Sequence, residues 1–233
     1  MRHLDLNLPI GDNIILFILI LEDVYKSFDD VSVLNGVNVH LERGKVYTLR
    51  GGNGSGKTTL FNIISGFVRP SNGVVWFRGK EMTRFSPYRI NRLGIGRTFQ
   101  DLRLATQMTV WENLFLAMEK GRFTFSSKNQ REKADDLTER LALHTKAEEL
   151  AGGISYGQQK LLTLGCCIAN DADLLLIDEP VAGIDKDDFA KITEIIAQLK
   201  SVGKTILQIE HHPDYIRATS DAVLTMEGGK IVC

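Results

Sequence analysis

The sequence predicts an α/β protein with a mostly parallel central sheet. Residues 46–49, apolar except for Thr48, and residues 174–177, all apolar, are short runs, each followed closely by glycine or acidic residues. A continuous apolar run of this length is typical of a strand buried on both faces of a parallel sheet. Ligands of such sheets collect at the carboxyl ends of the strands, so the polar residues after each run are candidates for a functional site.

Composition places the chain among ordinary globular proteins. With 43% hydrophobic and 24% charged residues, its 233 residues suffice for one α/β domain with a satellite subdomain, or for two small domains. A formal net charge of -1 provides no basic field that would attract nucleic acid, so we expect no such partner. The three cysteines, Cys166, Cys167 and Cys233, lack metal-type spacing, which indicates reduced thiols in a cytosolic protein.

The apolar run at residues 14–21 does not predict a membrane span. Its eight residues fall short of the roughly 20 that a spanning helix needs. A signal peptide is not predicted either, because no basic segment precedes the run and no small-residue cleavage site follows it. The β-branched and aromatic content predicts a buried strand instead, and we expect that the chain itself does not cross a membrane.

The segment after residues 46–49 predicts a phosphate-binding loop between a strand and a helix. It fits the pattern G-x-x-x-x-G-K-[ST] through Gly51, Gly56, Lys57 and Thr58. Glycines let the backbone point several N–H groups at one anion, the lysine neutralises the β- and γ-phosphates, and the threonine hydroxyl can ligate Mg²⁺. The predicted phosphate-binding residues are Gly51, Gly52, Asn53, Gly54, Ser55, Gly56, Lys57, Thr58 and Thr59.

The segment "LLLIDEP" places two carboxylates at the end of the second apolar run. Asp178 is predicted to hold Mg²⁺ directly or through a water, and Glu179 to polarise an attacking water. The alternative is a pair of solvated carboxylates at a strand end, which the phosphate loop upstream disfavours. Kinases and simple GTPases mostly need only the metal-binding aspartate, so the pair indicates ATP hydrolysis with a base of the protein's own.

The stretch "ISYGQQK", residues 154–160, has two compatible interpretations. Ser155 and Gln158 form the pattern of a capping box at a helix start. A glycine-bearing helix start also attracts phosphate through its N–H groups and dipole. A second capping box is predicted in "TVWE" (109–112), and "KNQREKADDLTERLAL" is a charged amphipathic stretch, so residues 101–165 are expected to be mostly helical.

With these motifs in order, the chain resembles the ATP-binding subunits of ABC transporters over nearly its full length. "GGNGSGKTT" resembles their phosphate loop, "RTFQ" their glutamine loop, "ISYGQQK" their signature, "LLLIDEP" their second acidic motif, "AGID" their aspartate loop and "IEHH" their switch histidine. The resemblance implies one ABC ATP-binding domain over residues 1–233. Residues 1–100 and 166–233 would form a P-loop ATPase core with a mostly parallel sheet and an antiparallel β subdomain. Residues 101–165 would form a helical signature subdomain.

The resemblance also implies ligands and roles. ATP and Mg²⁺ would bind, with Thr58, Gln100 and Asp178 toward the metal and Glu179 and His211 in catalysis. Two subunits would dimerise head to tail, as a homo- or heterodimer. The signature residues of one, Ser155 and Gly157, would then close over the γ-phosphate that the other holds.

The adenine contact and Asp185 carry alternatives, and the acidic and histidine residues at 210–212 invite a further one. Phe28 falls where the family stacks an aromatic ring on adenine, with Tyr25 as its competitor and a plain core aromatic as the simpler interpretation. Asp185 either caps a helix beginning near residue 187, links the two sites of the dimer, or does both. Glu210 with its two following histidines does not predict a metal site, because consecutive strand residues point to opposite faces.

Tyr156 in the signature is typical of the branch that powers import of branched-chain amino acids, and "GIGRTFQDLRLATQMTVWENL" resembles the same branch. Lys160 stands where arginine is commonest, "EHH" replaces the usual Glu-His-Asp, and the short tail usual in the branch is missing after Cys233.

The resemblance implies three partners: transmembrane permease subunits, a second ATPase subunit and a solute-binding protein. The helical subdomain would receive the coupling helix of the permease. The chain would lie on the cytoplasmic face of the membrane.

The alternatives are an ATPase of another ABC branch, for urea-type import or for lipid or polysaccharide export, and a soluble ABC ATPase acting on DNA or ribosomes. The soluble class usually carries long coiled-coil insertions or two ATPase units in one chain, neither of which fits 233 residues. A P-loop kinase would leave "ISYGQQK" and "IEHH" unexplained.

Overall fold

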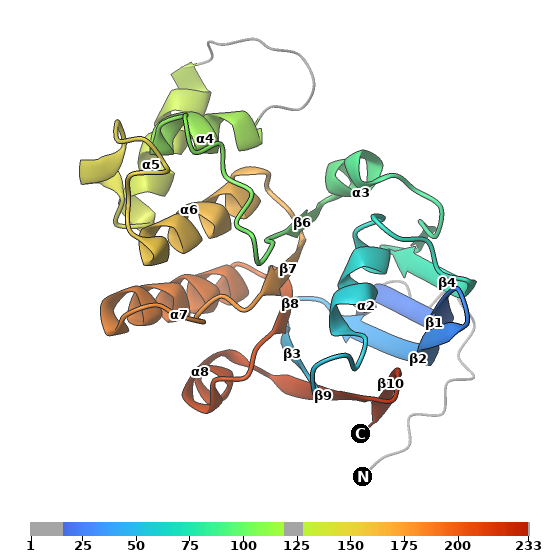
Figure 1. Cartoon of the computed structure of the whole chain (residues 1–233). Helices are drawn as coiled ribbons and strands as arrows, with labels where there is room; N and C mark the ends of the chain where they lie inside the picture. Colours follow the sequence, from blue (N-terminus) through green and yellow to red (C-terminus); the bar gives the residue numbers. More distant parts are fainter. Residues whose placement is uncertain (1–15, 119–127, 233) are drawn as a thin grey trace.

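The computed structural model describes residues 16–118 and 128–232, which form two sheets and their covering helices (Figure 1). The strands are β1 (Phe17–Phe28), β2 (Val31–Glu42), β3 (Val46–Arg50), β4 (Asn72–Phe77), β5 (Lys80–Glu81), β6 (Ile95–Arg97), β7 (Leu174–Asp178), β8 (Thr205–Ile209), β9 (Ala222–Glu227) and β10 (Lys230–Val232). The helices are α2 (Lys57–Ile64), α3 (Pro87–Leu93), α4 (Val110–Met118), α5 (Lys128–Arg140), the short 3-10 helix η1 (His144–Lys146), α6 (Tyr156–Ala169), α7 (Lys186–Ser201) and α8 (Pro213–Thr219).

The larger sheet has the order β10-β9-β3-β8-β7-β6. Its neighbouring strands run parallel except at the edge, where β10 and β9 are antiparallel. This confirms the predicted mostly parallel sheet, and β3 and β7 contain the two apolar runs from which it was inferred. The carboxyl ends of β6, β7 and β8 therefore lie at one edge of the sheet, where the predicted acidic residues are found.

The second sheet is antiparallel and has the order β2-β1-β4-β5. It confirms the antiparallel β subdomain that the family resemblance implied. The strand predicted at residues 14–21 is confirmed from Phe17 onward, whereas residues 14 and 15 lie outside the described residues and Leu16 is not in the strand.

The parallel sheet is covered on both faces, and alternate residues of one strand belong to different cores. Leu174 and Leu176 of β7 pack in the core that faces the antiparallel sheet. Leu175 and Ile177 pack in the core that faces α4, α6 and α7. Successive strand residues point to opposite faces, so an uninterrupted apolar run is what a strand covered on both sides requires.

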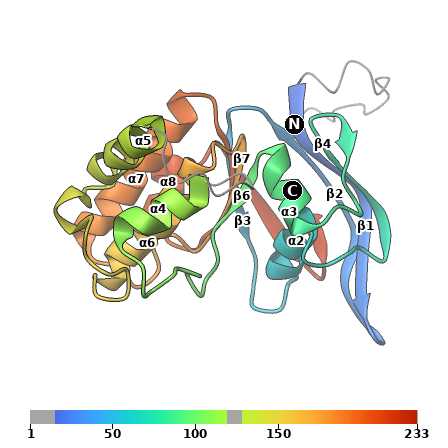
Figure 2. The same ribbon diagram turned by 90° about the horizontal axis from the view of Figure 1, so that it is seen from above.

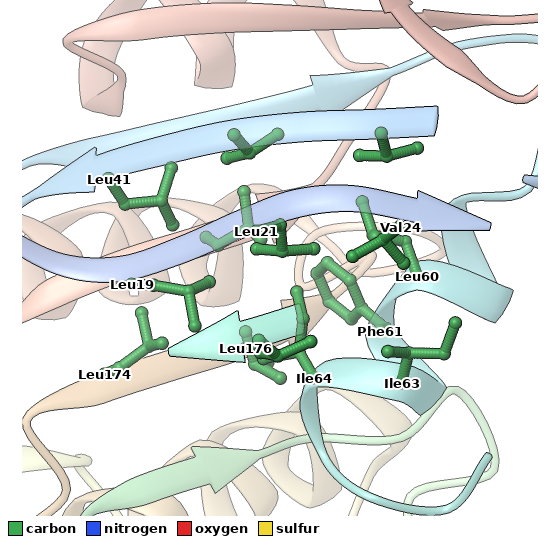
Figure 3. Packing of buried hydrophobic residues seen from close by; sticks show 14 of the residues in the cluster. Leu19, Leu21, Val24, Leu41, Leu60, Phe61, Ile63, Ile64, Leu174 and Leu176 are labelled. Atoms are coloured by element: carbon green, nitrogen blue, oxygen red, sulfur yellow. The ribbon is translucent and has the colours of Figure 1, made fainter. Parts of the chain in front are cut away.

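Helix α2 lies between the two sheets, as the view from above shows (Figure 2). Its buried residues Leu60, Phe61, Ile63 and Ile64 pack against Leu19 and its neighbours from the antiparallel sheet on one side, and against Leu174 and Leu176 on the other (Figure 3). The helix that begins at the phosphate loop is thus fixed from both sides.

The helical part lies on the opposite face of the parallel sheet and contains α4, α5 and α6 (Figure 1). Gly165 of α6 allows these helices to approach closely, because an added Cβ would collide with Leu141 and lie 3.0 Å from Leu114 Cδ2. The capping box predicted at residues 109–112 is confirmed: Thr109 N donates to Glu112 Oε2 at 2.7 Å and Glu112 N to Thr109 Oγ1 at 3.1 Å. Within the described residues no helix has the length and apolar character of a membrane span.

Two leucines of α4 provide a test of this core. Leu114 is fully buried, whereas Leu116, on the same helix, is 46% exposed. We expect Leu114→Ala to lower the free energy of unfolding by about 2–5 kcal/mol, since it removes buried methyl groups and leaves a cavity. The matched Leu116→Ala variant should change it by about 0.5 kcal/mol or less, measured by urea unfolding. Equal losses in both variants would contradict the packing described here.

Candidate functional site

The phosphate loop runs from the end of β3 to the start of α2 and is shaped by glycine. Gly56, the N-cap of α2, has φ +106° and is buried. A Cβ added there would lie 2.8 Å from Leu34 Cδ2 and 2.9 Å from Met226 Cε, so only glycine fits both the backbone and the space. The loop is therefore held against the antiparallel sheet and β9 while Gly52, Asn53 and Gly54 remain exposed.

The side chain of Lys57 is hydrogen-bonded to the backbone of the phosphate loop itself. Its Nζ donates to the carbonyls of Gly51 at 2.7 Å and Gly52 at 3.0 Å, and the side chain is buried. An ammonium group has three donors, so this arrangement leaves one to contact a bound anion. In the described part of the chain, the buried Ser55 Oγ has no hydrogen-bond partner, and it lies within the loop as a further polar group. Thr58 is exposed in the first turn of α2, and Thr59 is half-buried.

Asp178, which the sequence predicted as a metal ligand, is the last residue of β7 and is half-buried. Its backbone N–H donates to Thr98 Oγ1 at 3.0 Å, which joins the end of β7 to the segment after β6. Burial raises the pKa of Asp178, and the charges of Arg97, Lys57 and Lys160 oppose that rise, Arg97 most strongly. Lys57 and Asp178, far apart in the sequence, thus lie near enough at this edge of the sheet for their charges to interact.

Arg97 is a member of this site that the sequence argument left without a role. Its Nη1 donates to Asn62 Oδ1 at 2.8 Å and to Ser65 Oγ at 2.7 Å, both near the end of α2. The guanidinium also lies 4.6 Å from the ring centroid of Phe99, the residue before Gln100. Burial lowers the pKa of Arg97 to about 10, so it stays cationic at neutral pH. It links the helix of the phosphate loop to the predicted glutamine loop.

Gln100, Asp178 and Glu179 line one cavity of about 270 Å³, together with Tyr156 and Lys160 of α6. The structure therefore brings together three predicted site residues from segments separated by nearly 80 positions. Gln100 itself is exposed at the edge of this cavity. Ser155 is not part of the lining, and neither are the residues of the phosphate loop.

Glu179 has an uncommon backbone conformation. Its φ is +47°, in the left-handed region where residues other than glycine are strained by about 1–3 kcal/mol. Its N–H donates to Ile209 O at 3.0 Å, and its carbonyl accepts from Lys160 Nζ at 2.6 Å. The turn after β7 is thus anchored both to β8 and to α6.

Ser155 and Gln158 confirm the predicted capping box at the start of α6. Gln158 N donates to Ser155 Oγ at 3.2 Å, and Ser155 N donates to Gln158 Oε1 at 3.0 Å. Ser155 is exposed, whereas Gly157 is buried against the Asp188 carboxylate of α7, which a Cβ would overlap. Asp185 caps α7, as predicted: its Oδ1 accepts from the N–H groups of residues 187 and 188 at 3.0 and 2.9 Å.

Of the three residues that follow β8, Glu210 is buried and the two histidines are exposed. Glu210 is 3% exposed and its Oε2 accepts from His211 N at 2.6 Å, while Oε1 has no partner among the described residues. His211 and His212 are both exposed, and the ring of His212 lies 5.0 Å from that of Phe189. Across residues 16–118 and 128–232, no three histidine, cysteine or acidic side chains are grouped to hold a metal ion.

The two aromatic candidates for adenine, Phe28 and Tyr25, are both exposed on β1, which excludes a core role for Phe28. Phe28 lies under Lys26 Nζ, 4.6 Å from its ring centroid. The Tyr25 hydroxyl is held close to Gly36, where an added Cβ would lie 2.8 Å from it. Phe28 is 45% exposed and Tyr25 42%, so both rings are accessible to a base.

The residues present fit a nucleotide with a divalent cation. The threonine hydroxyl of Thr58, the amide of Gln100 and the carboxylate of Asp178 offer the hard oxygen donors that Mg²⁺ prefers. Ser55 Oγ, buried and without a partner in the described chain, is suited to donate to a phosphate oxygen. The glycine backbone and the start of α2 supply the N–H groups that bind phosphate.

Fold and site together define a phosphate-loop nucleotide hydrolase of the α/β class. A family model described as "ABC transporter" matches residues 34–182. The probable branched-chain amino acid transport ATP-binding protein LivG of Archaeoglobus fulgidus is 37% identical over 91% of this chain and 86% of that protein. The ribose import ATP-binding protein RbsA 3 of Rubrobacter xylanophilus is 32% identical over 91% of this chain, which spans only 43% of that relative.

A solved structure of the ADP conformation of an ATP-binding cassette of an ABC transporter superposes with a TM-score of 0.83. It is 32% identical, over 94% of this chain and 90% of that one. The chain belongs to the ABC transporter family, as an ATP-binding and ATP-hydrolysing subunit. The predictions of the family, the fold and an ATP hydrolase are confirmed.

The buried lysine of the loop allows a direct test. We expect Lys57→Ala to weaken ATP binding by about 10- to 100-fold, the equivalent of losing one hydrogen bond to a charged group. Isothermal titration calorimetry measures the affinity. Lys45→Ala, which removes a cation paired with Glu42 on the surface, should leave the affinity unchanged. An unaltered affinity in Lys57→Ala would show that ATP binds elsewhere.

Proposed function

We propose that this subunit hydrolyses ATP to power the import of a solute through permease subunits, with branched-chain amino acids as the solute class. The observation that carries the hydrolytic part is the pair Asp178 and Glu179 at the end of β7, close enough to the phosphate loop for the charge of Lys57 to lower the pKa of Asp178. The solute class is supported by the 37% identity to the LivG relative and by Tyr156 in the signature. The ribose-import relative makes sugar import the second candidate.

In this proposal, Lys57 and the N–H groups of residues 51–59 bind the β- and γ-phosphates. Thr58, Gln100 and Asp178 hold Mg²⁺, which when bound neutralises the developing phosphate charge. Phe28 stacks on the adenine, with Tyr25 as the alternative.

Glu179 is the proposed general base. Its carboxylate accepts a proton from the water that attacks the γ-phosphorus, and the bond to the leaving ADP oxygen breaks in line. His211, exposed at the end of β8, is proposed to hydrogen-bond the γ-phosphate and keep that water in line. Burial raises the pKa of Asp178, and the charges of Arg97, Lys57 and Lys160 oppose that rise and so favour the carboxylate form that a metal ion needs.

The complete site is proposed to need a second subunit, as a homo- or heterodimer assembled head to tail. Ser155 and Gly157 at the start of α6 then contact the γ-phosphate held by the other subunit, and Asp185 links the two sites. The capping box supports this because the helix start is satisfied by its own side chains until an anion arrives. Closure then depends on ATP, which alone brings the anion.

We propose the division into domains that the family resemblance implied: an ATPase core of residues 1–100 and 166–233, and a helical subdomain of residues 101–165, with α6 crossing the boundary. A groove of about 570 Å³ between them, lined by Phe99, Leu104 and Leu116 among others, is the proposed seat of the permease subunit. The chain would act on the cytoplasmic face of the membrane with a solute-binding protein in the system and without nucleic acid.

The first test removes the proposed base while keeping its shape. Glu179→Gln should lower the ATPase rate by about 10²- to 10⁴-fold, the usual contribution of a general base, and preserve ATP affinity. With ATP and Mg²⁺ the variant should elute as a dimer from a size-exclusion column.

Glu139→Gln, the same change on the exposed face of α5, is the matched control and should hydrolyse ATP at the normal rate. In cells, the Glu179→Gln variant should stop uptake of labelled leucine and leave ribose uptake intact. Normal ATPase activity in Glu179→Gln refutes the base assignment, and loss of ribose uptake instead of leucine uptake refutes the solute class.

The second test separates the cap from the composite site. If Ser155 only caps α6, Ser155→Ala costs about 0.5–2 kcal/mol of stability and aspartate substitutes well. If Ser155 also faces a partner's γ-phosphate, Ser155→Asp places like charge against a polyanion, so we expect a stable protein without ATPase activity. ATP affinity of the separate subunit should persist.

The matched control is Ser86→Asp, because Ser86 caps α3 in the same way, its side chain accepting from Arg89 N. This variant should be both stable and active. A stable, fully active Ser155→Asp protein would limit "ISYGQQK" to a helix cap.

A further inference from the structure

A buried lysine connects the signature helix α6 to the turn that carries Glu179. Lys160 is 8% exposed, and its Nζ donates to the backbone carbonyl of Glu179 at 2.6 Å. Nζ also lies 5.4 Å from the ring centroid of Tyr156, one turn earlier on the same helix. The lysine lines the cavity that Gln100, Asp178 and Glu179 share.

The carbonyl that Lys160 holds belongs to a strained residue. Glu179 has φ +47°, a conformation that persists in a residue other than glycine only where its surroundings fix it. Three hydrogen bonds do so: the Glu179 N–H donates to Ile209 O of β8, and the Glu179 carbonyl accepts from Ala182 N at 3.4 Å and, more closely, from Lys160 Nζ of α6 at 2.6 Å. Since the direction of the side chain follows from this backbone, the lysine helps to set where the Glu179 carboxylate points.

The charge of Lys160 is balanced inside the protein. Burial lowers the pKa of Lys160, and the carboxylates of Glu210, Glu179 and Asp178 oppose this, Glu210 most strongly. Glu210 is itself buried at the end of β8, next to His211. The ammonium group therefore stands among the acidic residues at the ends of β7 and β8, on a helix that belongs to the helical part of the molecule.

We propose that Lys160 is a positioning residue for ATP hydrolysis, which holds the left-handed turn at Glu179 and ties it to the signature helix of the same subunit. The proposal rests on the role of Glu179 proposed above. The start of α6 is the part that meets the partner's nucleotide, so a movement of α6 is passed through Lys160 to the base of this subunit's own site. Lys160 thereby couples the two composite sites of the dimer.

The test compares Lys160→Met with Lys160→Arg in the purified full chain. Methionine keeps the length and apolar stem but removes the donor, so kcat should fall by about 10- to 100-fold, as expected when a reacting group is misplaced by about 1 Å. The Kd for ATP should stay within about twofold, because the phosphate loop is untouched. Arginine can still donate to the carbonyl and should restore most of kcat.

A second measurement distinguishes this role from a structural one. In the Glu179→Gln background, Lys160→Met should leave the ATP-trapped dimer intact, since the lysine acts through residue 179. Loss of the trapped dimer in that double variant would overturn the proposal, because the lysine would then support the signature itself. If Lys160→Met does not fold, Lys160→Gln, which keeps a polar end but cannot span the distance, is expected to show the same fall in kcat.

Failure of this inference is distinguishable from failure of the proposed function. An inactive Glu179→Gln variant with a fully active Lys160→Met variant overturns the inference alone. An active Glu179→Gln variant overturns the base assignment on which it rests. A fall in kcat that Lys160→Arg does not relieve also contradicts the inference, because a donor to the carbonyl is then not what matters.

Discussion

Burial of the parallel sheet on both faces is the constraint on which the rest of the molecule depends. Leu174 and Leu176 pack in one core, and Leu175 and Ile177 pack in the other. Every position of β7 before its last residue is therefore buried and unsuited to a charged side chain. A buried polar group without a partner costs free energy, and Asp178 and Glu179 accordingly stand where β7 stops, each only half-buried. Asp178 and Glu179 at the end of β7 and Glu210 after the end of β8 therefore gather at the same edge of the sheet.

The antiparallel sheet contributes to the site indirectly, by supporting the phosphate loop. Leu34 of β2 and Met226 of β9 close the space around Gly56, and α2 is wedged between the two sheets. Asn35 joins them across the molecule, its N–H donating to Gly229 O and its side chain to Gly228 O, both at 2.8 Å. A loop that must present N–H groups in fixed directions needs such a rigid frame. A mobile loop would lose conformational entropy when the ligand binds, and its affinity would be lower.

Sequence reasoning succeeded where the signal is local. The two apolar runs predicted β3 and β7, and the spacing of Ser155 to Gln158 predicted a cap, because each depends on residues a few positions apart. The role of Lys160 could not be predicted, since its partner lies 19 positions away across a helix–strand contact. The left-handed backbone of Glu179 could not be predicted either, because glutamate, unlike glycine, does not indicate such a conformation. Such features come from packing between elements, which a single sequence does not encode in its periodicity.

The cations around Asp178 come from three different elements: Lys57 from α2, Arg97 from β6 and Lys160 from α6. A single arginine beside the carboxylate would have balanced its charge equally well. The distribution over three elements has a different consequence, because each cation also contacts another part of the molecule. Lys57 binds the carbonyls of the phosphate loop, Arg97 binds the end of α2 and lies over Phe99, and Lys160 binds the Glu179 carbonyl. A change in charge at Asp178 would therefore act on all three cations, which contact the phosphate loop, the segment before Gln100 and the signature helix. The coupling that we propose would need no long pathway, since the half-buried Asp178 carboxylate and its three partners already connect these parts.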